Sequence, residues 1–188
     1  MISASDPIGT LAQTGEATAF MAIDVRRLAP GDADQLFQLR RRALVEEPFA
    51  FLSSPNDDVA TSPDAVRAQL SVASENAVFG AFDAHELVAM AGVSRDRPIK
   101  AAHRVCVWGV FVDRRYRRQG VASDLLKAVL QYAEDLEGVE SVYLSVSEKT
   151  PNAKRLYESL GFEVWGLEPD CIRVEGESAR EYHLSKSL

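Results

Sequence analysis

The sequence has 188 residues, of which 46% are hydrophobic and 26% are charged, and its formal net charge is −7. This length suits one hydrophobic core rather than two. An acidic surface repels a phosphate backbone, and no apolar run approaches the roughly 20 residues that a membrane-spanning helix needs. We therefore expect neither nucleic acid nor a membrane as a partner.

Residues 1–22 are mostly small or polar and include acidic residues but no Lys or Arg. A secretory signal begins with basic residues and continues into an apolar stretch, and a transit peptide is rich in Arg. Because the segment has neither pattern, we interpret it as a flexible extension and expect a cytoplasmic protein. Residues 23–188 contain no repeat or linker, so we expect them to form a single domain.

The cysteines, Cys106 and Cys171, lie in strand-like segments and outside any CxxC pair. We expect free thiols rather than a disulfide or a metal site. The three histidines are scattered along the chain, and their spacing predicts no metal site.

The first half of the chain predicts one strand and two helices. Residues 23–28 alternate at their start as a strand does, and the break at 30–32 leads into a helix with one apolar face. Ser62, Pro63 and Asp64 then form a helix start, with an N-cap hydroxyl, a proline at the first helical position and an acid in the first turn. This second helix is expected to run to about residue 73.

The second half predicts most of the sheet. Strands at 77–82 and 87–94 are joined by a polar turn and indicate a hairpin, and a longer strand follows at 104–112. A basic turn leads into a helix that ends near residue 137, where Gly138 caps it. After a strand at 141–146 and a short helix from Pro151 to about Gly161, strands at 162–174 and 180–185 complete one α/β domain.

The most informative segment is 110–122, in which a strand enters a basic turn that leads directly into a helix. The first N–H groups of a helix lack internal partners, and the positive end of the helix dipole lies beside them. Gly120 allows close approach to this backbone, and Arg117 and Arg118 add charge, which predicts a diphosphate site. Neither Gly-Lys-Ser/Thr nor GxGxxG is present. The alternative is a solvated basic turn without a ligand.

Residues 117–122, RRQGVA, resemble the Gln/Arg-x-x-Gly-x-Gly/Ala motif of the GNAT superfamily of N-acetyltransferases. Residues 152–162, NAKRLYESLGF, resemble the family's second signature, Asn-x-x-Ala-x-x-Leu-Tyr-x-x-x-Gly-Phe, except that Thr150 occupies the asparagine position. The resemblance extends over 23–184. It implies a mixed, mostly antiparallel sheet of six to seven strands with a V-shaped splay, flanked by about four helices, in a monomer or homodimer.

The resemblance also implies acetyl-CoA as the co-substrate, with no metal. In the family the pantetheine arm lies in the splay and pairs with the long strand, which implies main-chain contacts to Val110, Phe111 and Val112. The pyrophosphate would accept hydrogen bonds from the amides of Gln119, Gly120, Val121, Ala122 and Ser123, beside Arg117 and Arg118. Asn152 would contact the arm near the thioester, and Arg155 would reach the adenosine end.

Tyr157 is similar to the general acid of the family, since a tyrosine can donate a proton to a departing thiolate. The alternative is a core tyrosine, because Tyr157 shares the helix face of Ala153 and Leu160. Many relatives carry a glutamate base on the long strand, but 104–112 contains no carboxylate. Other candidate bases are Glu46, Glu47, Glu168 and His183, and a water relay or an acceptor that is already neutral stays open. Candidate aromatic residues of the acceptor pocket are Phe49, Phe51, Trp108 and Trp165.

We therefore expect an N-acetyltransferase that moves the acetyl group of acetyl-CoA directly to a primary amine of a small molecule or protein. The missing strand carboxylate favours one alternative, a non-catalytic acyl-CoA-binding regulatory module. A plain α/β scaffold with a basic turn is the third possibility.

Overall fold

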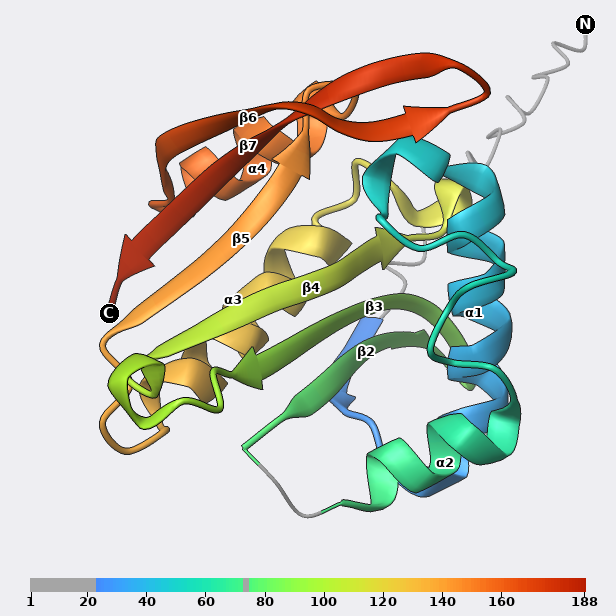
Figure 1. Cartoon of the computed structure of the whole chain (residues 1–188). Helices are drawn as coiled ribbons and strands as arrows, with labels where there is room; N and C mark the ends of the chain where they lie inside the picture. The colour runs from blue at the N-terminus through green and yellow to red at the C-terminus, as the bar shows by residue number, and fades with distance from the viewer. Residues whose placement is uncertain (1–22, 73–74) are drawn as a thin grey trace, which may run out of the picture.

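The strand-like segments form one seven-stranded sheet in the computed structural model, which describes residues 23–72 and 75–188 (Figure 1). The strand order is β1-β2-β3-β4-β5-β7-β6. The strands are β1 (Ile23–Arg27), β2 (Ala77–Asp83), β3 (Glu86–Arg95), β4 (Arg104–Val112), β5 (Ser141–Ser147), β6 (Glu163–Val174) and β7 (Glu177–Ser187). Only the β4–β5 pair is parallel, so the predicted mixed, mostly antiparallel sheet is confirmed.

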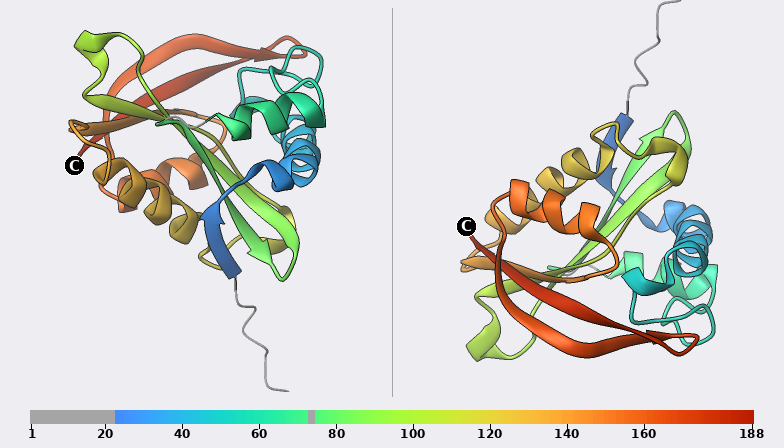
Figure 2. Two further views of the ribbon diagram at one scale, coloured as in Figure 1. Left: turned by 90° about the horizontal axis from the view of Figure 1, so that it is seen from below. Right: turned by 90° about the horizontal axis from the view of Figure 1, so that it is seen from above.

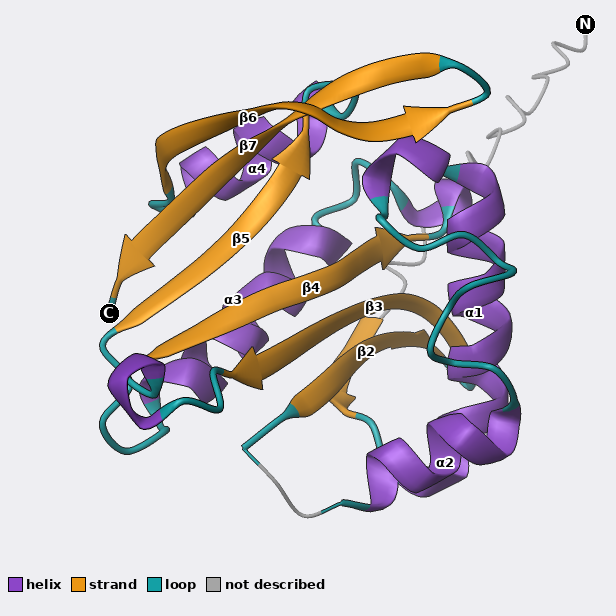
Figure 3. Cartoon of the chain, in the orientation of Figure 1, coloured by secondary structure: helices purple, strands orange, loops and turns teal. Residues whose placement is uncertain are grey.

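Four α-helices occur in the described part of the chain and are coloured purple in Figure 3. They are α1 (Ala33–Glu46), α2 (Pro63–Ser71), α3 (Val121–Glu134) and α4 (Pro151–Ser159). Views from below and above show α3 and α4 on one side of the sheet and α1 and α2 on the other (Figure 2). None of these helices is long and apolar enough to cross a bilayer. The predicted flexible extension, 1–22, lies outside the described residues.

Each face of the sheet has its own hydrophobic cluster. The cluster under α3 and α4 includes Leu125, Leu126 and Leu184, and the cluster under α1 and α2 includes Leu39, Val66 and Met90. Because each helix carries one apolar stripe, it can cover only one side of the sheet, and the two clusters fix which side that is.

Local signals placed several element ends correctly. Ser62 is the N-cap of α2, and its hydroxyl accepts a hydrogen bond from the Ala65 amide at 3.1 Å, as predicted. The predicted end of α3 near 137 was wrong, because the last helical residue is Glu134 and short turns lead from there to Gly138. The predicted start of β7 at 180 was also late. A tight turn through Glu175 and Gly176, both with positive φ, joins β6 to β7, so the strand pairing of the final hairpin continues up to that turn.

The splay between β4 and β5 is the feature that positions the site. These strands pair at only three positions, the last being Cys106 with Tyr143. Beyond them β5 pairs only with β7, and Figure 1 shows β4 and β5 diverging toward their ends. The predicted V-shaped splay is thereby confirmed. On its other edge β4 stays paired to β3 through a bulge near Gly92 and Trp108.

Candidate functional site

A cleft of about 550 Å³ lies in the open part of the splay. Its walls come from the end of β4, the start of α3, the start of α4 and the short 3₁₀ helix η2 (Pro48–Ala50) with the residues beside it. All the predicted cofactor-binding residues line it except Gln119 and Arg155, and the proposed acid Tyr157 also lines it. Segments that are distant in the sequence therefore meet at one cavity.

Unsatisfied main-chain amides occupy the α3 end of the cleft. Gly120 caps the helix with φ 86°, and no side chain caps it. The Asp124 amide donates to the Gly120 carbonyl at 3.0 Å, but the amides of Val121, Ala122 and Ser123 make no hydrogen bond to any described residue. These N–H groups at the positive end of a helix dipole suit an anion.

The side chains of the basic turn differ in what they contact. Arg118 also has a left-handed backbone, with φ 59°, and lines the cleft. Gln119 does not line it, because its side-chain amide donates to the Arg115 carbonyl at 2.8 Å. Arg117 lines the cleft but already contacts the protein: Nε donates to the Val112 carbonyl and Nη1 to Glu47 Oε1, each at 2.9 Å.

Strand pairing decides which main-chain groups of β4 face the gap. The Asp113 amide donates to the Val88 carbonyl on β3, and Phe111, two residues before Asp113, pairs with Met90. Since main-chain groups alternate between the two edges of a strand, those of Val110 and Val112 face the open side and those of Phe111 face β3. The phenylalanine side chain still forms part of the cleft wall.

Tyr157 belongs both to the core and to the cleft. Its side chain is buried, and its ring meets Phe162 edge-on with the centroids 6.0 Å apart. No hydrogen bond joins its hydroxyl to another described residue. Burial raises the pKa of this phenol well above its usual value, so the hydroxyl keeps its proton at neutral pH.

Two predicted contacts at α4 lie differently. Asn152 lines the cleft and accepts a hydrogen bond from Arg155 through its side-chain oxygen. Arg155 itself is exposed and outside the cleft wall. Thr150, which occupies the asparagine position of the second motif, also lines the cleft, and so does Lys149, which the sequence did not single out. The position of Lys149 two residues before the proline that begins α4 was the available signal.

Of the four candidate bases, Glu47 lines the cleft within the described chain. Glu46 forms an ion pair with Arg114 instead, at 3.3 Å. His183 lies on β7, and its ring nitrogens contact Glu168 Oε2 and Ser145 Oγ, each at 2.9 Å. The structure therefore places Glu47 at the cleft, Glu46 in an ion pair outside the cleft wall, and Glu168 and His183 in a polar group on the final strands.

The four aromatic candidates do not form one pocket. Phe51 lines the cleft, whereas the Phe49 ring lies under the Lys149 ammonium group at 5.7 Å. Trp108 covers Gly92 on the bulge, and the side chain of Trp165 is exposed beside His183.

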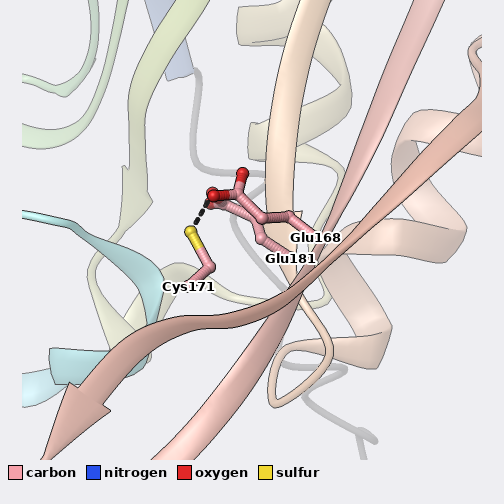
Figure 4. Close-up of side chains that lie close together, drawn as sticks. All are labelled: Glu168, Cys171 and Glu181. Atoms are coloured by element: carbon pink, nitrogen blue, oxygen red, sulfur yellow. Dashed lines mark hydrogen bonds between the residues drawn. The ribbon is translucent and has the colours of Figure 1, made fainter.

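One further group brings together metal-ligating atoms. Glu168, Cys171 and Glu181 offer ligand atoms within 4.8 Å of one another, and Figure 4 shows the two carboxylates meeting at the thiol. The thiol lies 3.2 Å from Glu181 Oε2, and burial together with this carboxylate raises the pKa of Cys171 to about 12. Sequence spacing missed the group because a bulged hairpin assembles it. Neither cysteine forms a disulfide within the described residues.

The cleft fits a ligand with an anionic linker and an amide-containing arm. Bare helix amides and Arg118 line it, and the main-chain groups of Val110 and the amide of Val112 face the gap without a partner on β5, while the Val112 carbonyl accepts from Arg117. Coenzyme A has both parts, a pyrophosphate and a pantetheine arm with two amides, so the residues present suit this co-substrate.

Comparisons with known proteins agree with this geometry. Over 77 residues the chain is 36% identical to human N-acetyltransferase 8, which covers 41% of the chain and 34% of that protein. Over 63 residues it is 36% identical to the spermine/spermidine N(1)-acetyltransferase of Bacillus subtilis, covering 34% and 41%. The matched segments thus span well under half of these relatives.

The fold is similar to that of YncA from Salmonella typhimurium, whose structure contains its cofactor acetyl-CoA. The TM-score is 0.78 at 16% identity, covering 89% of this chain and 94% of that one. The family model described as Acetyltransferase (GNAT) family matches residues 36–162. Since that match takes in both motifs and the walls of the cleft, the chain belongs to the GNAT family of acetyltransferases.

Proposed function

We propose that this protein transfers an acetyl group from acetyl-CoA to a primary amine of a small molecule or a protein. The observation that carries the proposal is that one cleft is lined by the bare amides of α3, the open edge of β4, Tyr157 and the residues around η2. A donor with an anionic linker at one end and a reactive thioester at the other suits that set of groups. The likeness to amine acetyltransferases supports the class of acceptor.

The protein's own groups would hold the donor without large rearrangement. The amides of Val121, Ala122 and Ser123 would donate to the pyrophosphate, and the main chain of Val110 and the amide of Val112 would pair with the pantetheine arm. A ligand bound in this way replaces the missing strand in the gap, so its reactive end is directed toward α4 and η2.

The chemistry needs a neutral amine and a leaving sulfur. An alkylamine with a pKa of about 10.4 must lose a proton, which costs roughly 4–5 kcal/mol at pH 7. The amine would attack the thioester carbonyl and the C–S bond would break, with Tyr157 donating its proton to the departing sulfur and regaining one through solvent from the nitrogen that becomes the amide. Tyr157 is protonated at neutral pH in any case, and its raised pKa makes it a weaker acid toward the sulfur. The benefit is modest, because a thiolate with a pKa of about 8.5 already leaves well.

The test is to incubate the purified protein with acetyl-CoA and a panel of alkylamines, diamines, amino acids and lysine peptides. Release of free CoA thiol, with an acetylated amine identified by mass spectrometry, is the expected result. CoA binding without product across the panel would favour the non-catalytic binding module. A calorimetric titration that shows no CoA binding would eliminate both functions.

A further inference from the structure

The adjacent arginines of the basic turn have different surroundings. Arg118 lines the cleft and makes no hydrogen bond or ion pair with another residue that the structure describes. Arg117 also lines the cleft, but its guanidinium bonds to the Val112 carbonyl and to Glu47, and it lies 5.6 Å from the centroid of the Phe111 ring. One side chain is thus available to a ligand and the other is already in use.

Arg117 connects two separate walls of the cleft. Val112 is at the open edge of β4, whereas Glu47 directly precedes η2 and shares its side of the cleft with Ala50 and Phe51. We call Glu47, Ala50 and Phe51 the η2 wall. Arg114 makes a second, longer contact to Glu47 at 3.5 Å. Arg117 therefore provides the shorter of two links between this wall and the turn before α3.

The free energy needed to contact a bound pyrophosphate would differ between the two arginine side chains. Arg117 has N–H donors left beyond those that bond Val112 and Glu47, but these bonds hold its guanidinium in place and Glu47 already neutralises its charge, whereas Arg118 has no partner to give up among the described residues. Charge-assisted hydrogen bonds are among the stronger ones, and Arg forms them best in a fixed fork geometry. The anion is therefore better served by Arg118 and the α3 amides.

We propose that Arg117 is a positioning residue that holds the η2 wall against β4 and so sets the space for the acceptor, which leaves Arg118 to the pyrophosphate site described above. The effect on the acceptor rests on the proposed function, but the separation of Arg117 from the pyrophosphate can be tested with CoA alone.

The donor arm of the test compares Arg118→Gln with Arg117→Gln by calorimetric titration with CoA at low and high salt. We expect R118Q to raise the Kd roughly 10-fold or more, since one charge-assisted hydrogen bond to the anion is lost. The salt dependence of binding should weaken in the same variant, because fewer charges face the ligand. R117Q should stay within about twofold of the wild type, because its guanidinium is committed to protein atoms.

The acceptor arm compares R117Q with Glu47→Gln, which breaks the same ion pair from the other side. Both should raise the KM for the amine several-fold with little change in kcat, and the double variant should be no worse than either single one. A large loss of kcat in E47Q that R117Q does not share would mark Glu47 as the general base and overturn its role as a wall residue. Hydrogen exchange of amides 47–51 should be faster in each. Glu46→Gln is the matched control, because Glu46 neighbours Glu47 but does not line the cleft.

Three further results would overturn the proposal. A loss of CoA affinity in R117Q as large as that in R118Q would place Arg117 on the phosphate. An unchanged KM and unchanged amide exchange in E47Q, or the same effects in E46Q, would remove the role of the wall. If the wild type acetylates no amine, the proposed function fails, yet the CoA titrations and hydrogen exchange still decide whether the arginines differ.

Discussion

At the scale of single residues, Tyr157 is both a core residue and a residue of the cleft wall. Its ring packs in the hydrophobic core, the residue lines the cleft, and no described residue forms a hydrogen bond with its hydroxyl. Removing the hydroxyl therefore removes no structural hydrogen bond, which makes this position a clean test of chemistry.

We expect Tyr157→Phe to lower kcat by roughly 10- to 100-fold, with little change in the KM for acetyl-CoA, since general acid catalysis typically contributes 10²–10⁴-fold and a thiolate needs less help than most leaving groups. Steady-state kinetics would measure this, and urea unfolding would show whether stability is kept. An unchanged kcat would mean that Tyr157 is only a core residue.

Gly120 is suited to its position by its backbone conformation. Its φ of 86° is strained for any residue with a Cβ, although the nearest atom to such a Cβ would be Asp124 Oδ2 at 3.9 Å. Strain rather than collision should therefore decide the outcome. Gly120→Ala is expected to cost about 1–2 kcal/mol of unfolding free energy, which is the penalty for a left-handed L-residue, and to weaken CoA binding.

Gly31→Ala is the control, because no atom lies within 4 Å of its added Cβ and its φ is not in the left-handed region. Urea unfolding and CoA calorimetry on the two variants provide the comparison. Equal stability of both variants would show that the turn before α3 adapts to a side chain at no cost.

At the scale of elements, the bulge in β4 is held by a tryptophan lying flat on a neighbouring strand. A Cβ on Gly92 of β3 would lie only 2.2 Å from Trp108 Cε2. The ring therefore requires a glycine beneath it, and β4 shifts its register against β3 at this point. The shift decides that Val112, rather than Phe111, turns its main chain toward the gap.

Gly92→Ala should push the ring out of place and destabilise the protein by about 1–3 kcal/mol, the usual cost of overpacking. Urea unfolding would measure this, with Gly166→Ala as a control because its Cβ would meet only His183 at 3.8 Å. Near-equal midpoints for the two variants would refute the tight contact.

At the scale of the whole molecule, ion pairs tie the segments around the sheet together. The Arg115 guanidinium lowers the pKa of Asp113, at the end of β4, and the Arg26 guanidinium lowers that of Asp32, before α1. A carboxylate with a lowered folded-state pKa stabilises the fold above its unfolded pKa, and this contribution is lost as the pH falls through the folded value.

Stability should therefore be nearly constant from pH 7 to pH 5 as far as these groups are concerned, and should fall below about pH 4, where the unfolded chain begins to bind protons. Urea unfolding at a series of pH values would test this. Asp113→Asn should flatten the acid limb, and an identical limb in that variant would show that Asp113 contributes nothing to it.

The order of elements could be predicted because it depends on local signals, whereas most of the candidate site residues came from the resemblance of two motifs to a known family. The positive φ of Gly120 is a property of that residue alone, and the position of the unsatisfied helix amides follows from where α3 begins. Contacts between distant segments could not be predicted in this way. Arg117 meets Glu47 across a separation of 70 residues, and no periodicity encodes that pair. Cys171 meets Glu181 because β6 bulges between Glu168 and Ile172, a shift that alternation alone does not reveal.

The short junction between β4 and β5 has a mechanical consequence. Three residue pairs join the half of the sheet that carries β5, β6 and β7 to the half that carries β1 to β4, and those pairs lie at the end opposite the cleft. The two halves of the sheet are thus joined along a short junction at one end. A small tilt of one half about this junction changes the width of the cleft opening most and the three residue pairs of the junction least. The cleft can therefore adjust to ligands of different width while every strand stays hydrogen-bonded to its neighbour.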